Sequence, residues 1–364
     1  MHVSSPAYTP NVAIQSQPPL IFATELDGSA LNTMLATYDL YTEFAQRGYG
    51  LALAIGDLSD VRAAVVQQLN AHQIYTVAWM MLPAIDGYGF NLRNYPQAIE
   101  HYRTFRAWAQ QHGLHFAAIA MNMQPPADDL SRLQHLRLRD IGRWLAQASD
   151  NTLFLPGSTA YHSLIDEMHR DGYAVHTYQL PLMVDDRRAG TTSVQSALDV
   201  VDLPVDLEVL MCHSSLPIPI EGLNNDIGGA LIVSYGASAE SIGIGYTHAA
   251  SQRSVSDAPG VLEARALSLS WDALERDMLL ATRYTDTIYI FSLEGCVERG
   301  LMPHIANINW DGDVRVPVRQ RLLVATLRSS LLVLLFLVRQ HRLLFSWLGW
   351  IIALLLLVRQ WRRQ

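Results

Sequence analysis

The sequence predicts a (β/α)8 TIM-barrel-like domain followed by a C-terminal transmembrane helical hairpin. Short apolar runs alternate with amphipathic stretches through residues 20–313, a pattern that is typical of a parallel sheet with helical crossovers. No glycine-rich phosphate fingerprint follows the first apolar run, which favours a closed barrel over an open dinucleotide-binding sheet. After Asp313 the composition becomes apolar and basic, and this change indicates a membrane segment.

Apolar runs bounded by glycine, proline and polar residues are expected to form the strands of the barrel. Residues 152–155 are a further candidate, so the expected number of strands is eight or nine. The stretch 227–246 is ambiguous, and we favour a helix near 229–234 and then a strand. The expected strands cover residues 20–25, 51–56, 75–82, 116–121, 174–180, 207–212, 242–246 and 287–293.

Between these runs, apolar residues recur at helical spacing, and polar residues at the start of each stretch can cap a helix. The first helix is expected to begin at Asp27-Gly28-Ser29 and to continue to Arg47, where glycines end it. Asp57 and Ser59 open the second helix, and Gly113 ends the third. Further helices are expected over residues 128–147, 158–169, 191–200 and 270–284.

The composition excludes several classes of function. The net charge is −8, whereas a nucleic-acid-binding protein needs a cationic face. All 26 basic residues are arginine, so phosphate-loop lysines and Schiff-base chemistry are excluded. Cys212 and Cys296 are expected to be buried free thiols. The histidines and the Asp185-Asp186 pair are too scattered to indicate a metal site, and no cofactor is predicted.

The two ends of the chain differ from the predicted barrel. Residues 1–19 form a polar leader without the features of a signal peptide, so we expect the barrel to stay in the cytoplasm. Residues 314–364 contain two apolar runs, 322–338 and 343–358, which arginines flank, and the first run is interrupted by Arg328 and by Ser329-Ser330. Each run is about 25 Å long as a helix, slightly short of a bilayer core. We therefore expect a hairpin, spanning or re-entrant, with the lipid bilayer as partner.

Several polar side chains should gather at the carboxyl ends of the strands, where a parallel barrel places its chemistry. Glu25 and Glu294 end the first and last strands, which are neighbours in a closed barrel. Two carboxylates at a suitable separation are what glycoside hydrolysis needs. Alternatively, Glu294 caps a turn and Glu25 pairs with an arginine. His176 is interpreted as a core histidine, and Asp57 is interpreted mainly as a helix cap. The candidate ligand-binding residues are Asp57, Tyr88, Asn122, Gln124, Tyr178 and His213.

The end of the fourth strand carries Asn122-Met123-Gln124. In layout, this resembles the chitinase-like glycoside hydrolases, which have an Asp-x-Glu pair at this place with the glutamate as the acid. The resemblance implies a sugar-cleaving barrel, but both charges are replaced by amides here. An amide cannot donate and recover a proton near pH 7 as a carboxyl group can. Any cleavage would then depend on Glu25 and Glu294.

Two hypotheses for the function follow. The first is a membrane-anchored barrel that acts on or binds a glycan, with Glu294 and Glu25 as catalytic residues. The second is a catalytically silent barrel that serves as a binding or scaffold module at the membrane.

Overall fold

The computed structural model describes residues 17–126, 151–213, 227–247 and 268–361, with side chains up to residue 340. Eight parallel strands form a closed barrel in sequence order, and β1 pairs with β8. The predicted TIM-barrel-like fold is confirmed. The strands are β1 (Leu20–Thr24), β2 (Gly50–Ile55), β3 (Thr76–Met80), β4 (Ala118–Asn122), β5 (Ala174–Gln179), β6 (Leu207–Met211), β7 (Ser241–Gly245) and β8 (Ile288–Phe291).

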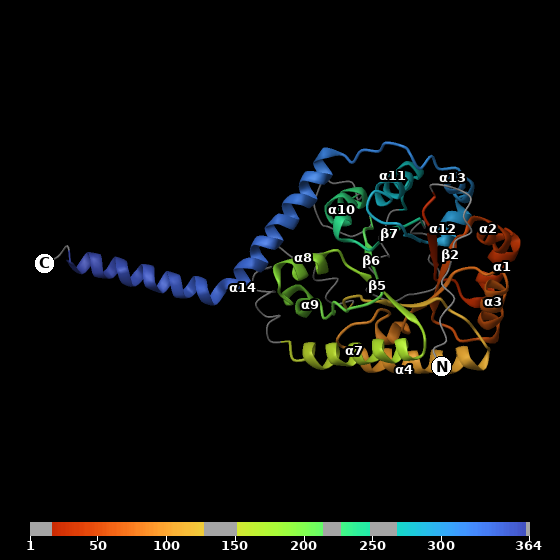
Figure 1. The fold of residues 1–364 in the computed structure, drawn as a ribbon, viewed down its shortest axis with the longest axis horizontal. Helices are drawn as coiled ribbons and strands as arrows, with labels where there is room; N and C mark the ends of the chain where they lie inside the picture. The colour runs from red at the N-terminus through yellow and green to blue at the C-terminus, as the bar shows by residue number, and fades with distance from the viewer. Residues whose placement is uncertain (1–16, 127–150, 214–226, 248–267, 362–364) are drawn as a thin grey trace.

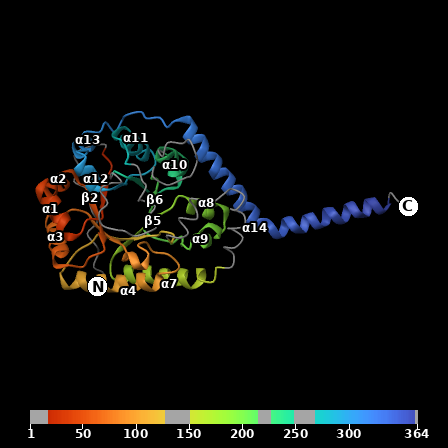
Figure 2. The ribbon, with the colours of Figure 1, turned by 180° about the vertical axis from the view of Figure 1, so that it is seen from behind.

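Helices surround the strands, and a long C-terminal helix lies along one side before it projects away from the barrel (Figures 1 and 2). The predicted free thiols, Cys212 and Cys296, are both buried. The helices are α1 (Gly28–Thr37), α2 (Leu40–Arg47), α3 (Asp60–Ala71), α4 (Tyr95–Gln111), α7 (Phe154–Arg170), α8 (Leu182–Ala189), α9 (Ser193–Ala197), α10 (Gly228–Tyr235), α11 (Trp271–Ala281), α12 (Leu293–Glu298), α13 (Met302–Ala306) and α14 (Val318–Trp361), with 3-10 turns η1 (Ala84–Asp86) and η2 (Gly236–Ser238).

The inside of the barrel is filled by small side chains on some strands and large aromatic ones on others. Alternate residues of each strand point inward. Those of β2 and β4 are alanines, whereas β3, β5 and β8 contribute Trp79, Tyr178 and Phe291. On β7 the place of an inward side chain is taken by Gly243, where a Cβ would lie 3.2 Å from the Phe291 ring. The barrel is therefore a packed core, as is usual for this fold.

Three sequence predictions about the elements differ from the structure. The single helix expected up to Arg47 is divided into α1 and α2, because Asp39 adopts a left-handed conformation with φ of 50°. Residues 152–155 do not form a strand: β4 pairs directly with β5, so no edge is left for them, and α7 begins at Phe154. Only α9 forms within the helix expected over 191–200, and α8 precedes it. The helix expected over 128–147 and most of the leader lie outside the described residues.

The membrane segment also differs from the expectation. Among the described residues, Val318–Gln340 is long and apolar enough to cross a membrane, with a mean hydropathy of 2.0. The predicted hairpin is not observed, because α14 runs as one helix from Val318 to Trp361. Its arginines at 339 and 342 were expected at the turn. They do not interrupt the backbone hydrogen bonds of a helix, since arginine is a good helix former.

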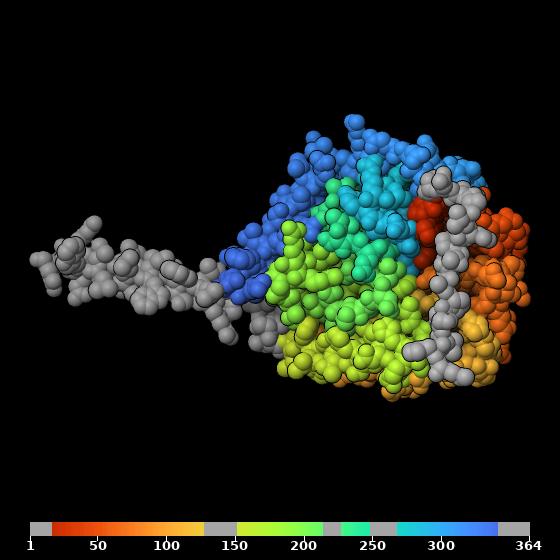
Figure 3. Space-filling model, in the orientation of Figure 1, coloured from red at the N-terminus to blue at the C-terminus, as the bar shows by residue number. Residues whose placement is uncertain are grey.

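The first half of α14 packs against the barrel domain (Figure 3). Leu335 is fully buried in a cluster with residues of α8 and α9. Arg328 Nε lies 2.7 Å from Oδ1 of Asp185, which is itself fully buried on α8. The Arg328 guanidinium also lies 4.1 Å from the centre of the Tyr235 ring on α10 and donates to the Ser234 carbonyl. This part of α14 is thus a component of the helical layer.

Candidate binding site at the barrel mouth

Three aromatic rings close the barrel just below its carboxyl-terminal mouth. Trp79 lies edge to face with Tyr178 at 5.5 Å and with Phe291 at 5.6 Å, and Tyr178 lies 5.6 Å from Phe291. These geometries are the preferred ones for aromatic pairs. All three side chains are at most 4% exposed. The three rings therefore form an apolar floor beneath the mouth that solvent scarcely reaches.

Buried polar atoms surround the same floor. The Nε1 of Trp79, the hydroxyl of Tyr178 and the Nε2 of His213 have no hydrogen-bond partner among the described residues. The His213 ring lies 4.9 Å from both Phe291 and Tyr246. Burial lowers the pKa of His213 to about 3, and it raises the pKa of Tyr178 well above its usual value. Both groups are therefore neutral near pH 7 and can donate or accept a hydrogen bond.

The two amides that replace the expected acids lie together at the end of β4. Asn122 and Gln124 alternate with the outward-facing Met123, so they share the inner side of the strand, and the Asn122 Nδ2 lies 3.4 Å from the Gln124 Oε1. Phe90 pairs with Met123 as an isolated bridge, which extends the sheet above β3 and β4. A Cβ on Gly89 would lie 2.4 Å from Gln124 Cβ, so only glycine allows this close approach.

The loop between β3 and α4 also brings Tyr88 next to this bridge. Tyr88 is half-buried and has a φ of 65°, and its carbonyl accepts a hydrogen bond from the Leu82 amide. The hydrogen bond from Leu82 and the bridge at Phe90 hold the loop on either side of Tyr88. The Tyr88 side chain therefore has a defined place at the rim of the barrel mouth.

The two acids predicted as catalytic residues meet at the junction of β1 and β8. The backbone amide of Glu25 donates to the Glu294 Oε1 at 2.9 Å. Glu294 is 2% exposed and lies in the first turn of α12, three residues beyond Phe291 at the end of β8, and its Oε2 has no partner among the described residues. The side chain of Glu25 is exposed. The prediction that Glu25 and Glu294 lie next to each other is confirmed, whereas their catalytic role stays a prediction.

Asp57 is occupied by structural contacts. It accepts hydrogen bonds from the Gly28 amide, from the Ser59 hydroxyl and from Arg62, whose side chain is almost fully buried. Burial alone would raise the pKa of Asp57, but the Ser59 hydrogen bond and the Arg62 charge outweigh it and lower the pKa. Asp57 therefore joins the starts of α1 and α3, as expected of a helix cap, and its role in ligand binding stays a prediction.

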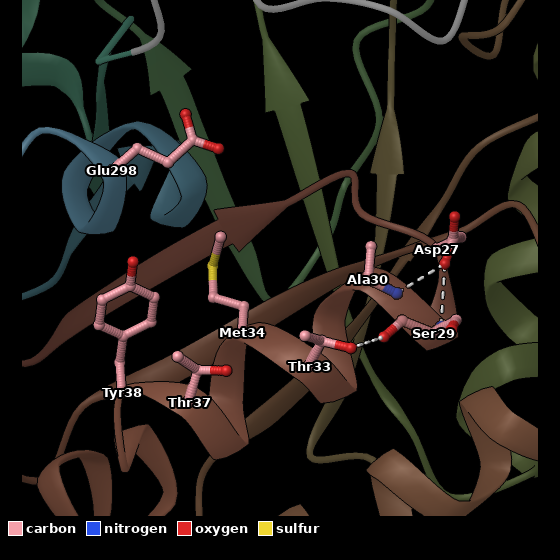
Figure 4. Close-up of a pocket in the computed structure, with 8 residues that line it drawn as sticks. All are labelled: Asp27, Ser29, Ala30, Thr33, Met34, Thr37, Tyr38 and Glu298. Atoms are coloured by element: carbon pink, nitrogen blue, oxygen red, sulfur yellow. Dashed lines mark hydrogen bonds between the residues drawn. The ribbon is translucent and has the colours of Figure 1, made fainter.

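A shallow groove lies outside the mouth, between α1 and α12 (Figure 4). Met34 of α1 and Tyr38, which follows the end of α1, face Glu298 across it, and Asp27 at one end caps α1 through the amides of Ser29 and Ala30. None of the predicted site residues lines this groove. Its position on the helical layer makes it separate from the mouth.

Sequence reasoning missed the aromatic floor, because Trp79 and Phe291 look like ordinary members of apolar strands. The available signal was their alternation with outward-facing residues, since only alternate positions of a strand point inward. His176 is a core histidine as predicted: it is 4% exposed, its Nδ1 lies 2.9 Å from the Tyr289 hydroxyl, and burial lowers its pKa to about 4.

Several solved structures are similar to this chain at low identity. L-ribulose 3-epimerase is 15% identical with a TM-score of 0.38, covering 91% of this chain and 98% of that chain. An endo-β1,6-glucanase is 13% identical with a TM-score of 0.40, covering 77% and 67%. Orotidine 5′-phosphate decarboxylase from Lactobacillus acidophilus is 16% identical with a TM-score of 0.26, covering 69% and 100%. No protein-family model and no curated protein matches the chain. These three proteins have different activities, so the likeness assigns none to this chain.

Proposed function

We propose that this protein is a membrane-tethered barrel that binds a glycan at its mouth. The observation that carries the proposal is an apolar aromatic floor beneath a rim of amides and one buried carboxylate. Sugars combine apolar ring faces with many hydroxyls, and amides and carboxylates can bond those hydroxyls. Asn122, Gln124 and Glu294 supply these groups, and Tyr88 can add an apolar face at the rim.

Cleavage of a glycosidic bond is the second part of the proposal, and it depends on Glu294 with Glu25. Glu294 is favoured because one oxygen is held by the Glu25 amide while the other has no partner among the described residues. A buried carboxyl group with one free oxygen can act as an acid. The amides at Asn122 and Gln124 favour the alternative, a barrel that binds without cleaving.

The tether is the C-terminal helix. Residues 343–358 are an uncharged, mostly apolar run between Arg342 and Arg359, and flanking arginines can reach the headgroups from a short span. Within about 20 residues of this run there are three arginines on each side, Arg328, Arg339 and Arg342 before it and Arg359, Arg362 and Arg363 after it, so these charges do not choose the side of the barrel.

The experiment compares the full-length protein with Glu294→Gln, Glu25→Gln and Gln124→Ala in one panel of oligosaccharides and chromogenic glycosides. Glu298→Gln is the matched control, because Glu298 lies one turn further along α12 and faces the outer groove. Loss of one neutral hydrogen bond should weaken binding by about fivefold, from about 1 kcal/mol. Removal of a catalytic acid should lower turnover by about 10²–10⁴-fold.

The outcomes distinguish glycan cleavage from glycan binding without cleavage. Turnover that is lost in Glu294→Gln but kept in Glu298→Gln supports the hydrolase. Binding without turnover, weakened by Gln124→Ala, supports the silent binding module. If the wild type neither binds nor cleaves any member of the panel, the proposal of a glycan site is wrong.

A further inference from the structure

The docked half of α14 has two faces with different partners. Val324, Arg328 and Leu335 point towards the barrel, and the Arg339 Nη1 donates to the Ala189 carbonyl at 2.8 Å. The opposite face is exposed, and large apolar residues at both ends flank a short polar stretch with Thr326, Ser329 and Ser330. Its large residues are Leu322 (59% exposed), Val333 (59%), Phe336 (56%) and Leu337 (44%).

The buried ion pair opposes insertion of this half across a bilayer. Arg328 lies near the middle of Val318–Gln340, the segment whose length and composition suit a span. In a spanning helix it would lie near the bilayer centre, where an arginine is most costly. Its departure would also leave the buried Asp185 without the Arg328 guanidinium. The contacts with α8 and α10 therefore favour a helix that stays on the barrel.

The charge of the segment indicates what covers the exposed face. Residues 314–364 contain nine arginines and no acidic residue. Arg319, Arg321 and Arg339 are exposed at the two ends of the docked half. A second copy of the same face would bring these arginines near one another, whereas anionic headgroups would attract them. The apolar run 343–358 follows the docked half in the same helix.

We propose that the outward face of α14 from Leu322 to Leu337 lies in the headgroup region of an anionic bilayer while its other face stays on the barrel. This inference rests on the proposed membrane tether and deepens it. The barrel then lies against the membrane surface, and the chain crosses once, at residues 343–358. An apolar helical face flanked by arginines is typical of helices that lie in the interface.

The test places an environment-sensitive dye at single introduced cysteines in the full chain. Phe336→Cys and Ser330→Cys report on the outward face. Tyr38→Cys is the matched control, because Tyr38 is 55% exposed at the end of α1, a helix on the opposite side of the barrel from α14 (Figure 1). The native thiols, Cys212 and Cys296, are fully buried and should not react in the folded protein. The protein is reconstituted into phosphatidylcholine vesicles with and without phosphatidylserine.

We expect the dye at position 336 to shift its emission to the blue and to be shielded from aqueous iodide. Both effects should be stronger with phosphatidylserine, and position 38 should stay accessible. Quenchers attached to lipids at the headgroup should reach positions 330 and 336 better than quenchers deep in the acyl chains.

Three results would overturn the proposal. Stronger quenching of position 330 by the deep quencher would show that the first half spans the bilayer. Iodide quenching at position 336 equal to that at position 38, in protein that floats with the vesicles, would refute the surface contact and leave the tether intact. Efficient cross-linking between two Phe336→Cys chains would assign the face to a second copy. If the protein does not float with vesicles at all, the tether itself fails.

Discussion

Replacement of Arg328 by alanine should destabilise the barrel strongly, although the residue lies in the predicted membrane tail. The guanidinium is 2.7 Å from a carboxylate that is fully buried, and it also stacks on the Tyr235 ring at 4.1 Å. Truncation would leave Asp185 with the Tyr235 hydroxyl, 2.6 Å from its Oδ2, but without the guanidinium. Removal of one partner from a buried ion pair typically costs about 3–5 kcal/mol. A native domain has only about 5–15 kcal/mol of stability, so this loss should be large.

The assay is denaturant unfolding of the full chain in detergent, followed by tryptophan fluorescence, with Arg319→Ala as the control. Arg319 lies on the same helix but is exposed, so its replacement should change stability by less than about 0.5 kcal/mol. The double variant Asp185→Leu with Arg328→Met removes both charges and should recover part of the loss, because apolar residues often replace a buried pair without cost. If Arg328→Ala is no less stable than Arg319→Ala, the inferred role of the ion pair is wrong.

Three further predictions concern the tail and the response to pH. A chain ending at Gln340 should unfold at the same denaturant concentration as the full-length protein. A chain ending at Asp313 should unfold at a lower denaturant concentration, because it lacks Arg328, the partner of Asp185. Equal unfolding midpoints for the two truncated chains would contradict this. Glu208 has its pKa raised to about 6 by burial, so the stability that its protonated form provides is present below about pH 4.5 and is lost as the pH rises through 6. Glu208→Gln should flatten the fall in melting temperature over that range, and an unchanged slope would count against it. His213 has its pKa lowered to about 3, so its contribution is present above about pH 6.5 and is lost as the pH falls. As the pH falls from 6.5 to about 3, the melting temperature of His213→Gln should therefore fall less than that of the wild type. Thermal melts across that pH range measure the difference.

The sequence alone predicted the barrel and most of its strands. Alternation of apolar runs with amphipathic helices is a local property, so it can be recognised without the tertiary structure. The junction of Glu25 and Glu294 was also predictable, because closure of the barrel makes the first and last strands neighbours.

Two features could be learned only from the tertiary structure: which rings form the floor of the barrel mouth, and how the C-terminal helix packs on the barrel. An inward-facing Trp79 and an outward-facing leucine are both apolar, so composition does not show which rings meet across the barrel. Local spacing favoured the candidate strand 152–155, but direct pairing of β4 with β5 excludes it. Arg328 appeared as an interruption of an apolar run because its partner, Asp185, is 143 residues away in the chain. Such a pair forms only when α8 and α14 pack together, and its energy depends on burial that no local sequence pattern reports.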